Sequence, residues 1–169
     1  MERSFDPGKA LVVKLNKLGD SVAFLPTLEA IRVRWPAAQI TALTTSAGKE
    51  VFECAGSANR ILTAEIEEIK SPPGFLKWLK LVRPCRFDVA VASSDSSSFV
   101  ALLFFMSAIP VRIGFTNPKL NFLFNVKIPF SEDTSHIKLN LLIAERLGCA
   151  ASYLRPKIYI PEKDKETVL

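Results

Sequence analysis

The sequence predicts an α/β protein with a doubly wound, mostly parallel sheet, and three observations carry that prediction. Short β-branched or apolar runs alternate with helical patterns along the chain, as they do in parallel sheets. The opening run 11–13 (Leu-Val-Val) is apolar enough for a strand that is buried on both faces. Of the 169 residues, 49% are hydrophobic and 23% are charged, which suits an ordinary globular core.

The expected strands are short apolar runs bounded by polar or turn residues, and they lie at 10–15, 39–44, 60–63, 87–92, 111–115, 126–129 and 157–160. The expected helices have apolar residues at helical spacing, and they lie at 26–34, 47–54, 75–82, 99–107 and 136–147. We expect residues 1–9 to be a flexible lead-in, 10–160 to be one domain, and 161–169 to be the start of a linker.

Local signals set several of the expected boundaries. Pro26 lacks an N–H, so we expect an irregular turn over 21–25 and a regular helix only from Pro26. Ser46 and Ser135 are expected to cap the helices that follow them. The segment 72–74 (Pro-Pro-Gly) predicts a turn, and Gly148 predicts a helix end.

Side-chain patterns predict how two of the helices pack. In 75–82, the residues Phe75, Leu76, Leu79 and Val82 are expected to face inward, with the lysines outward. The helix 99–107 is apolar nearly all round, so we expect it to be largely buried.

The charge and the cysteines limit the classes of function. A net charge of +5 favours an anionic partner such as a phosphate or an acidic lipid, whereas the scattered basic residues lack the stripe of a nucleic-acid binder. Cys54, Cys85 and Cys149 fit neither a disulfide framework nor a metal site, so reduced thiols in the cytoplasm are expected. The N-terminus has no apolar signal core, and the apolar run 99–110 is too short to span a bilayer.

The loop after the first strand is the first place to expect chemistry, because open α/β sheets bind ligands beyond the carboxyl ends of their strands. Asp20 follows Gly19 there, and its carboxylate could accept a proton from a hydroxyl. From spacing alone, N-capping by Asp20 or Ser21 is the favoured role, since N-cap aspartates are common. Lys14 and Lys17 flank this loop, and either could hold an anionic substrate. Lys14 lies in the strand, where the alternative is that its side chain extends to the surface, and Lys17 is the better candidate, with an ordinary solvated lysine as its more common alternative.

Two other polar positions are candidates. His136 opens the last helix and is either a ligand contact or an ordinary helix-start residue. Asp95 follows the fourth strand in a serine-rich loop, where helix capping accounts for it equally well. No glycine-rich dinucleotide fingerprint, Walker sequence or Asp-x-Asp motif occurs, so no cofactor and no metal are expected.

Five sequence segments, in the order in which one protein family has them, resemble that family. They are the segments at 11–32 (with Leu18-Gly19-Asp20), 35–40, 86–91, 111–115 (Val-Arg-Ile-Gly-Phe) and 136–148 (His136 to Leu147-Gly148). Together they resemble glycosyltransferase family 9, the lipopolysaccharide heptosyltransferases and their relatives. The family implies a GT-B fold of two Rossmann-like domains, of which this chain would be the N-terminal, acceptor-binding one.

The resemblance implies roles for individual residues. Asp20 would be the general base, and Lys17, Gly19, Ser21, Asp95, Arg112, His136 and Lys138 would contact the acceptor or shape the cleft. Arg112 serves equally well as a surface arginine at a strand start. The chain has Ser94-Asp95-Ser96 where many members have glutamine-glycine, and Lys138 and Asn140 where a basic residue is usual after the histidine.

The implied reaction transfers heptose from an ADP-sugar to the lipopolysaccharide inner core, or to a related anionic glycolipid, at the cytoplasmic face of the inner membrane. The donor would be bound mainly by a second domain outside these residues. The alternative is a stand-alone, non-catalytic α/β binding or interaction domain.

Overall fold

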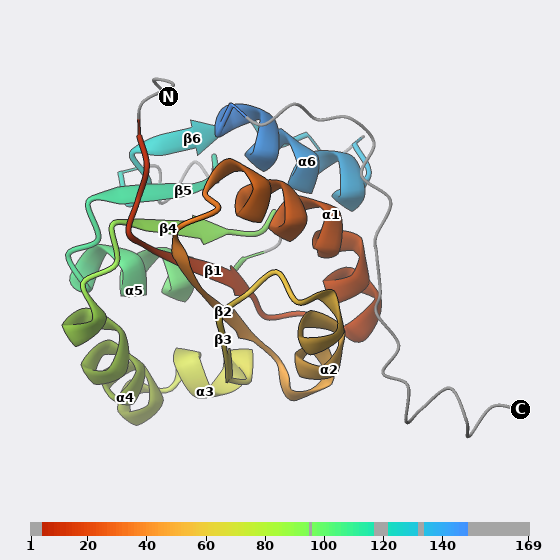
Figure 1. Cartoon of the computed structure of the whole chain (residues 1–169). Coiled ribbons are helices and arrows are strands. Elements are labelled where there is room, and N and C mark those ends of the chain that lie inside the picture. The colour runs from red at the N-terminus through yellow and green to blue at the C-terminus, as the bar shows by residue number, and fades with distance from the viewer. Residues whose placement is uncertain (1–4, 95, 117–121, 132–133, 149–169) are drawn as a thin grey trace, which may run out of the picture.

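A computed structural model describes residues 5–94, 96–116, 122–131 and 134–148. One sheet of six parallel strands has the order β3-β2-β1-β4-β5-β6 (Figure 1). The strands are β1 (Lys9–Lys14), β2 (Gln39–Thr44), β3 (Arg60–Thr63), β4 (Val89–Ala92), β5 (Val111–Phe115) and β6 (Val126–Ile128). The doubly wound α/β class predicted from the sequence is confirmed, and the strand order reverses between β1 and β4. The expected strand at 157–160 lies outside the described residues, as do Asp95 and Cys149.

Helices cover both faces of the sheet. They are α1 (Leu18–Arg34), α2 (Ser46–Ala55), α3 (Ile66–Lys70), α4 (Pro72–Val82), α5 (Ser98–Met106) and α6 (His136–Arg146), with a short 3₁₀ turn, η1 (Arg83–Cys85). α1, α2 and α6 lie on one face, and α3, α4 and α5 lie on the other (Figure 1).

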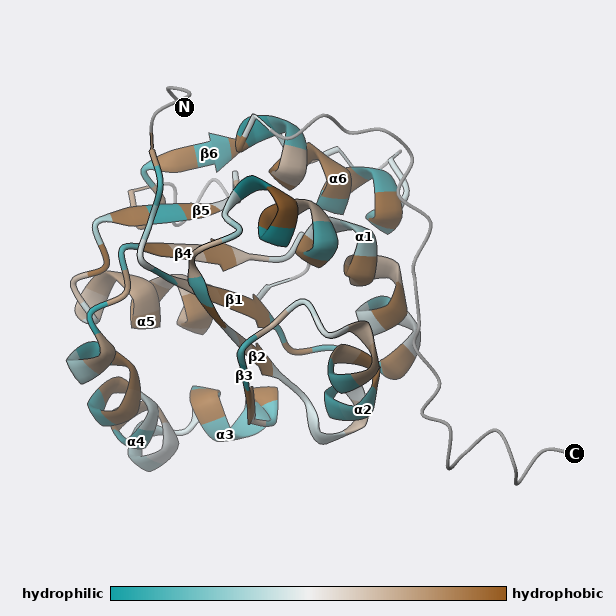
Figure 2. Cartoon of the chain, viewed as in Figure 1, coloured by the Kyte–Doolittle hydropathy of each residue, from teal (hydrophilic) through white to brown (hydrophobic). Residues whose placement is uncertain are grey.

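The sheet has a hydrophobic core on each face, and the alternating side chains of β1 contribute to both. Ala10 and Val12 point into the core beneath α1, α2 and α6, whereas Leu11 and Val13 point into the core beneath α3, α4 and α5. All four are completely buried, as expected for a central parallel strand. In Figure 2 the inner strands are accordingly coloured as hydrophobic over most of their length.

Helix α1 begins earlier than predicted. It starts at Leu18 and contains Pro26, so the expected irregular turn over 21–25 is wrong. Pro26 removes one hydrogen bond, the one that residue 26 would donate to the carbonyl of residue 22. The helix continues through this point because its buried side chains on either side of Pro26, including Phe24 and Leu28, hold it against the sheet.

Helix α4 also differs from its prediction. The residues 72–74 form its first turn, with the prolines at the positions that need no N–H, and the Ser71 hydroxyl accepts a hydrogen bond from Gly74 N. Leu76 is 50% exposed, whereas Trp78 lies on the side of α4 that packs against the rest of the fold and is buried. The expected inward orientation of Leu76 is therefore wrong.

Smaller corrections follow from the other helices and strands. Thr45, not Ser46, caps α2, and the charged stretch after β3 forms the short helix α3. Strand β4 starts at Val89, two residues later than expected. Helix α5 is not buried all round, because Phe99 and Phe105 are 39% and 48% exposed. Ser135 caps α6 through Lys138 N, and Gly148 follows that helix with φ +79°, both as predicted.

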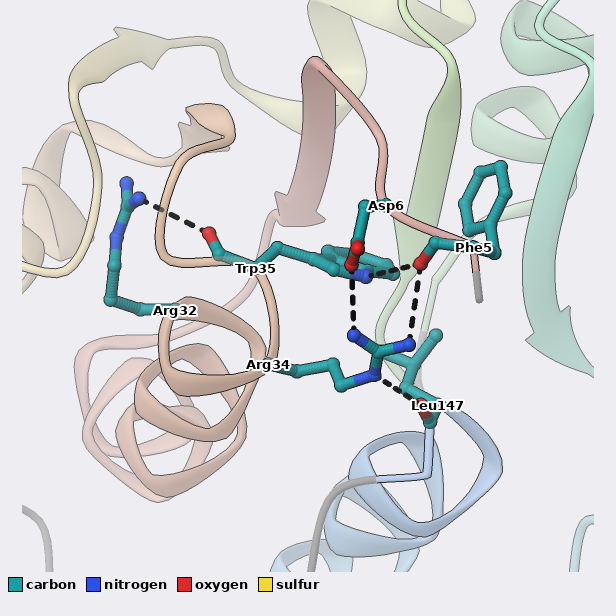
Figure 3. Close-up of polar contacts among 6 residues, drawn as sticks. All are labelled: Phe5, Asp6, Arg32, Arg34, Trp35 and Leu147. Atoms are coloured by element: carbon teal, nitrogen blue, oxygen red, sulfur yellow. Dashed lines mark hydrogen bonds and ion pairs between the residues drawn. The ribbon is translucent and has the colours of Figure 1, made fainter. Parts of the chain in front are cut away.

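At the amino edge of the sheet, arginine side chains form hydrogen bonds between segments that are distant in sequence (Figure 3). Arg34 donates to the carbonyls of Phe5 and Leu147 and pairs with the Asp6 carboxylate at 2.9 Å. Trp35 Nε1 donates to the same Phe5 carbonyl at 3.1 Å. These contacts join the segment before β1 to the ends of α1 and α6, at the edge opposite the predicted site.

Candidate functional site

The predicted site lies where the strands end and α1 and α6 begin. Both helices follow parallel strands on the same face of the sheet and contact one another, so their N-termini meet the same edge (Figure 1). The loop after β4 ends at this edge too. Helix N-termini carry partial positive charge, which favours an anionic ligand at this edge.

Asp20 is the third residue of α1 and is half-buried. Lys17 is the N-cap, and its carbonyl accepts the N–H groups of Asp20 and Ser21 at 3.1 Å each. The expectation that Asp20 or Ser21 caps the helix is therefore wrong. Among the described residues nothing donates to the Asp20 carboxylate or pairs with it, so the carboxylate is available to a ligand hydroxyl.

Lys17 and Gly19 are both exposed beside Asp20. A Cβ added at Gly19 would meet nothing within 4 Å. Packing within the chain therefore does not require a glycine in this helical turn, where alanine would be more stable. Open space above Gly19 leaves room for a ligand to approach the backbone and the Asp20 carboxylate.

Ser21 is completely buried, unlike a side chain that contacts substrate. Its hydroxyl donates to the Lys17 carbonyl at 3.4 Å, and a Cβ added at Gly48 of α2 would lie 2.7 Å from that hydroxyl oxygen. Ser21 and Gly48 thus set the close approach of α1 and α2. The structure does not place Ser21 with the exposed site residues, and its role there is to hold the turn that carries Asp20.

The loop after β4 is joined to α6 by two contacts. Ser94 N donates to Asn140 Oδ1 at 3.3 Å, and Ser94 Oγ lies 3.5 Å from His136 Nδ1. His136 and Lys138 are exposed on the first turn of α6, as a contact to an acceptor requires.

Asn140 is a residue that sequence reasoning did not identify as functional. It is completely buried, and its Nδ2 has no partner among the described residues. A buried amide group without a hydrogen bond lowers the free energy of unfolding, so such a group in a native fold needs an explanation. We therefore count Asn140 among the candidate site residues. The available signal was its place four residues after His136, on the same side of the helix.

Two hollows flank the serine-rich loop. One, of about 150 Å³, lies between the serines and the aromatic rings of Phe115, Phe124 and Phe130. The other lies between Ser96, Ser97 and Ser98 and the residues Leu15, Asn16, Ile66 and Lys70. The loop also caps α5, because Ser97 Oγ accepts from Phe99 N at 3.3 Å. Polar hydroxyls and apolar rings therefore border the same edge as Asp20.

Glu65 adds an acid near the start of α2. Its carboxylate accepts hydrogen bonds from Ser46 Oγ at 2.6 Å and from Ser46 N at 3.1 Å. These two hydrogen bonds lower the pKa of Glu65 below its ordinary value. The Glu65 carboxylate therefore binds the N-terminus of α2.

Arg112 does not belong to this group. It is the second residue of β5, and its backbone pairs with the level of Ala90, near the amino ends of the strands. Its guanidinium donates to the carbonyls of Leu123 at 2.7 Å and Ile109 at 2.6 Å, and it lies over the Phe105 ring. Its place at the strand start matches the structural alternative considered for Arg112, and no acceptor contact is proposed for it.

Lys14 is completely buried at the end of β1, so the alternative that its side chain extends to the surface is wrong. Within the described ranges, no group of three or more His, Cys, Asp or Glu side chains could hold a metal ion. No helix there is long and apolar enough to cross a membrane.

Comparison with known proteins finds similarity in structure and not in sequence. No protein-family model matches the chain. No curated protein matches it either. The chain resembles solved structures of glycosyltransferases.

A glycosyl transferase of family 9 from Veillonella parvula DSM 2008 superimposes with a TM-score of 0.80 and 16% identity, over 98% of this chain and 49% of that one. The E. coli ADP-heptose lps heptosyltransferase II gives a TM-score of 0.74 and 19% identity, over 94% and 49%. The E. coli heptosyltransferase WaaC with ADP-2-deoxy-2-fluoro heptose gives 0.70 and 16%, over 88% and 51%.

The chain spans about half the length of the structures it matches. The predicted resemblance is confirmed in the fold, since the Rossmann-like arrangement of six parallel strands is common to this chain and those enzymes. At 16–19% identity the likeness extends to the fold alone. The chain therefore has the fold of one half of a family 9 glycosyltransferase.

Proposed function

We propose that this chain is the N-terminal, acceptor-binding half of a glycosyltransferase that moves heptose from an ADP-sugar to the lipopolysaccharide inner core or a related anionic glycolipid. The observation that carries the proposal is the Asp20 carboxylate. It lies on the first turn of α1, half-exposed and without a partner among the described residues, beside open space at Gly19. The likeness of the fold to heptosyltransferases supports the choice of reaction.

In this mechanism Asp20 acts as the general base. It accepts the proton of an acceptor hydroxyl, whose oxygen then attacks the anomeric carbon of the donor sugar while the bond to the ADP phosphate breaks. Lys17 and Lys138, both exposed at the same edge, bind the anionic groups of the acceptor. His136 orients an acceptor hydroxyl or phosphate, held by its contact with Ser94. No cofactor and no metal take part in the proposed reaction.

The donor would be bound mainly by a second α/β domain outside these residues. We propose a cytoplasmic location at the inner membrane face, where a glycolipid acceptor is presented. The net charge of +5 supports an anionic partner of this kind.

The test uses the enzyme that carries both domains. Asp20→Asn should fold normally and lose roughly 10²-fold or more in transfer rate, the usual contribution of a general base. The matched control is Asp88→Asn at the opposite edge, whose carboxylate accepts from Lys9 N; its transfer rate should stay near that of the unaltered enzyme. A well-folded Asp20→Asn enzyme with near-normal turnover would exclude the proposed base.

A further inference from the structure

Large apolar side chains are exposed together on α4, α5 and the segment after β5. We call them the α4–α5 apolar face, and its members are Leu76, Leu81, Phe99, Phe105, Met106 and Phe122. Edge-on ring contacts pack α4 against α5 and α5 against the segment after β5: the half-buried Phe75 of α4 lies 6.4 Å from Phe99, and Phe105 lies 6.5 Å from Phe122. Monomeric proteins rarely expose apolar groups contiguously without using them for binding.

Positive charge accompanies this face. Between residues 70 and 87 the chain has five basic residues and no acidic one; they are Lys70, Lys77, Lys80, Arg83 and Arg86. The neighbouring acids of α3 are paired, because Glu67 binds Lys70 at 2.9 Å and Glu68 binds Lys77 at 2.6 Å. Lys80, Arg83 and Arg86 are exposed and have no ion pair among the described residues. An unbalanced positive charge therefore borders the apolar side chains.

The helical period places both kinds of side chain on one side of α4. At about 100° per residue, Lys80 and Lys77 lie between Leu76 and Leu81 around the helix. Trp78 and Val82 form the opposite, buried side. On the exposed side of α4 the two lysines are thus flanked by leucines, and basic and apolar side chains next to one another are typical of surfaces that bind the interface of a lipid bilayer.

We infer that the α4–α5 apolar face docks on an anionic lipid bilayer. Its apolar side chains would enter the boundary between headgroups and acyl chains, and Lys80, Arg83 and Arg86 would contact the acidic headgroups. This inference rests on the proposed function in one respect, since a glycolipid acceptor is presented at such a surface. Phe99 begins α5 next to the serine-rich loop, so the docked face continues to the edge of the candidate site.

The charge distinguishes the bilayer from a second copy of the chain. A symmetric dimer contact places the same patch of both copies together, so the basic residues would face one another. An anionic surface instead complements them.

The experiment uses the 169-residue chain and vesicles, without donor or acceptor. The chain should cosediment with vesicles containing phosphatidylglycerol, bind neutral phosphatidylcholine vesicles much more weakly, and dissociate as salt is raised. Lys80→Gln/Arg83→Gln should weaken partitioning about 30-fold, from about fivefold for each basic residue at the surface. Phe105→Ser/Phe122→Ser should weaken it by roughly tenfold or more.

Matched variants lie on the other side of the protein. Val33→Ser removes a side chain that is 70% exposed on α1, and Lys49→Gln/Arg146→Gln removes two exposed charges from α2 and α6; both should bind vesicles like the unaltered chain. No binding to anionic vesicles, or equal losses in the control variants, would overturn the inference. A dimer in sedimentation that Phe105→Ser/Phe122→Ser disperses, with no vesicle binding, would assign the face to a second copy. Because vesicle binding needs no catalysis, it separates failure of this inference from failure of the proposed transfer.

Discussion

Gly48→Ala tests whether the contact between α1 and α2 positions the turn that carries Asp20. The added Cβ would lie 2.7 Å from Ser21 Oγ and would also collide with Thr44 Oγ1, whereas ordinary contacts begin near 3.4 Å. Both neighbours are completely buried, so the helices must separate by several tenths of an ångström. Overpacking costs about 1–3 kcal/mol, and because the added Cβ collides with two buried groups we take the upper half of that range, about 2–3 kcal/mol. The better helix propensity of alanine returns at most about 1 kcal/mol.

The net loss is then about 1–2 kcal/mol, which lowers Tm by roughly 2–8 °C for a domain of this size. Thermal unfolding followed by circular dichroism measures it. Because Ser21 adjoins Asp20, the same displacement should reduce transfer by the two-domain enzyme more than the loss of stability alone explains, since misplacement by about 1 Å costs about 10²-fold.

A second substitution checks the cause. Thr44 Oγ1 has no hydrogen-bond partner among the described residues, so Thr44→Ala removes one collision without breaking a hydrogen bond there. In the double variant with Gly48→Ala, the free energy of unfolding should recover by about 1 kcal/mol relative to additivity. A Gly48→Ala protein as stable as the original, or strict additivity in the double variant, would refute the reasoning.

Three further predictions concern single positions. Gly19→Ala should raise the free energy of unfolding by about 0.5–1 kcal/mol, because the added Cβ meets open space, yet it should weaken acceptor binding in the two-domain enzyme. Lys17→Ala should raise the acceptor KM more than the donor KM, an effect that shrinks with salt; a change in the donor KM alone would contradict the assignment. Arg34→Ala should destabilise the chain by about 1–3 kcal/mol, since it leaves the Leu147 carbonyl without its side-chain donor and the Phe5 carbonyl with Trp35 Nε1 alone. Asp6→Asn should cost under about 1 kcal/mol because the Asp6 side chain is 74% exposed, and equal costs in chemical denaturation would show that the ion pair dominates.

Much of the sheet could be predicted because its signals are local. Strands β2, β3 and β5 match their expected bounds, since each is a short apolar run closed by polar or turn residues. Helix α6 starts at its predicted residue because Ser135 is a strong N-cap, and it ends within one residue of the prediction because Gly148 is a strong terminator.

The errors came from proline and from helix phase. Pro26 was expected to delay α1, but burial of its neighbours outweighs one lost hydrogen bond. Pro72 and Pro73 were interpreted as a turn, although proline at the start of a helix is equally common. Starting α4 earlier does not change its period, so the exposure of Leu76 reflects which side of the helix the rest of the fold covers, and no local pattern contains that information.

The candidate site could be predicted only in part. The sequence does not show which polar side chains are buried or which of them have hydrogen-bond partners within the fold. Ser21 and Arg112 have suitable chemistry, yet the first is sealed between two helices and the second is held by carbonyls at the wrong edge. Asn140 could not be identified from the sequence, because what distinguishes it is a buried amide nitrogen without a hydrogen-bond partner among the described residues.

Charged side chains at the two edges of the sheet differ in whether they have partners within the chain, and this difference supports the location of the candidate site. At the amino edge, Arg32 and Arg34 donate to main-chain carbonyls, as Arg32 does to Ala38 at 2.9 Å and Ser57 at 3.0 Å. Burial lowers the pKa of Arg32, and those carbonyls compensate its charge. At the carboxyl edge, Asp20 and Lys17 have no such partners among the described residues, beside two helix N-termini. Exposed and half-exposed charges without an ion pair among the described residues, gathered where parallel sheets bind ligands, are what the proposed substrate-binding role of this edge requires.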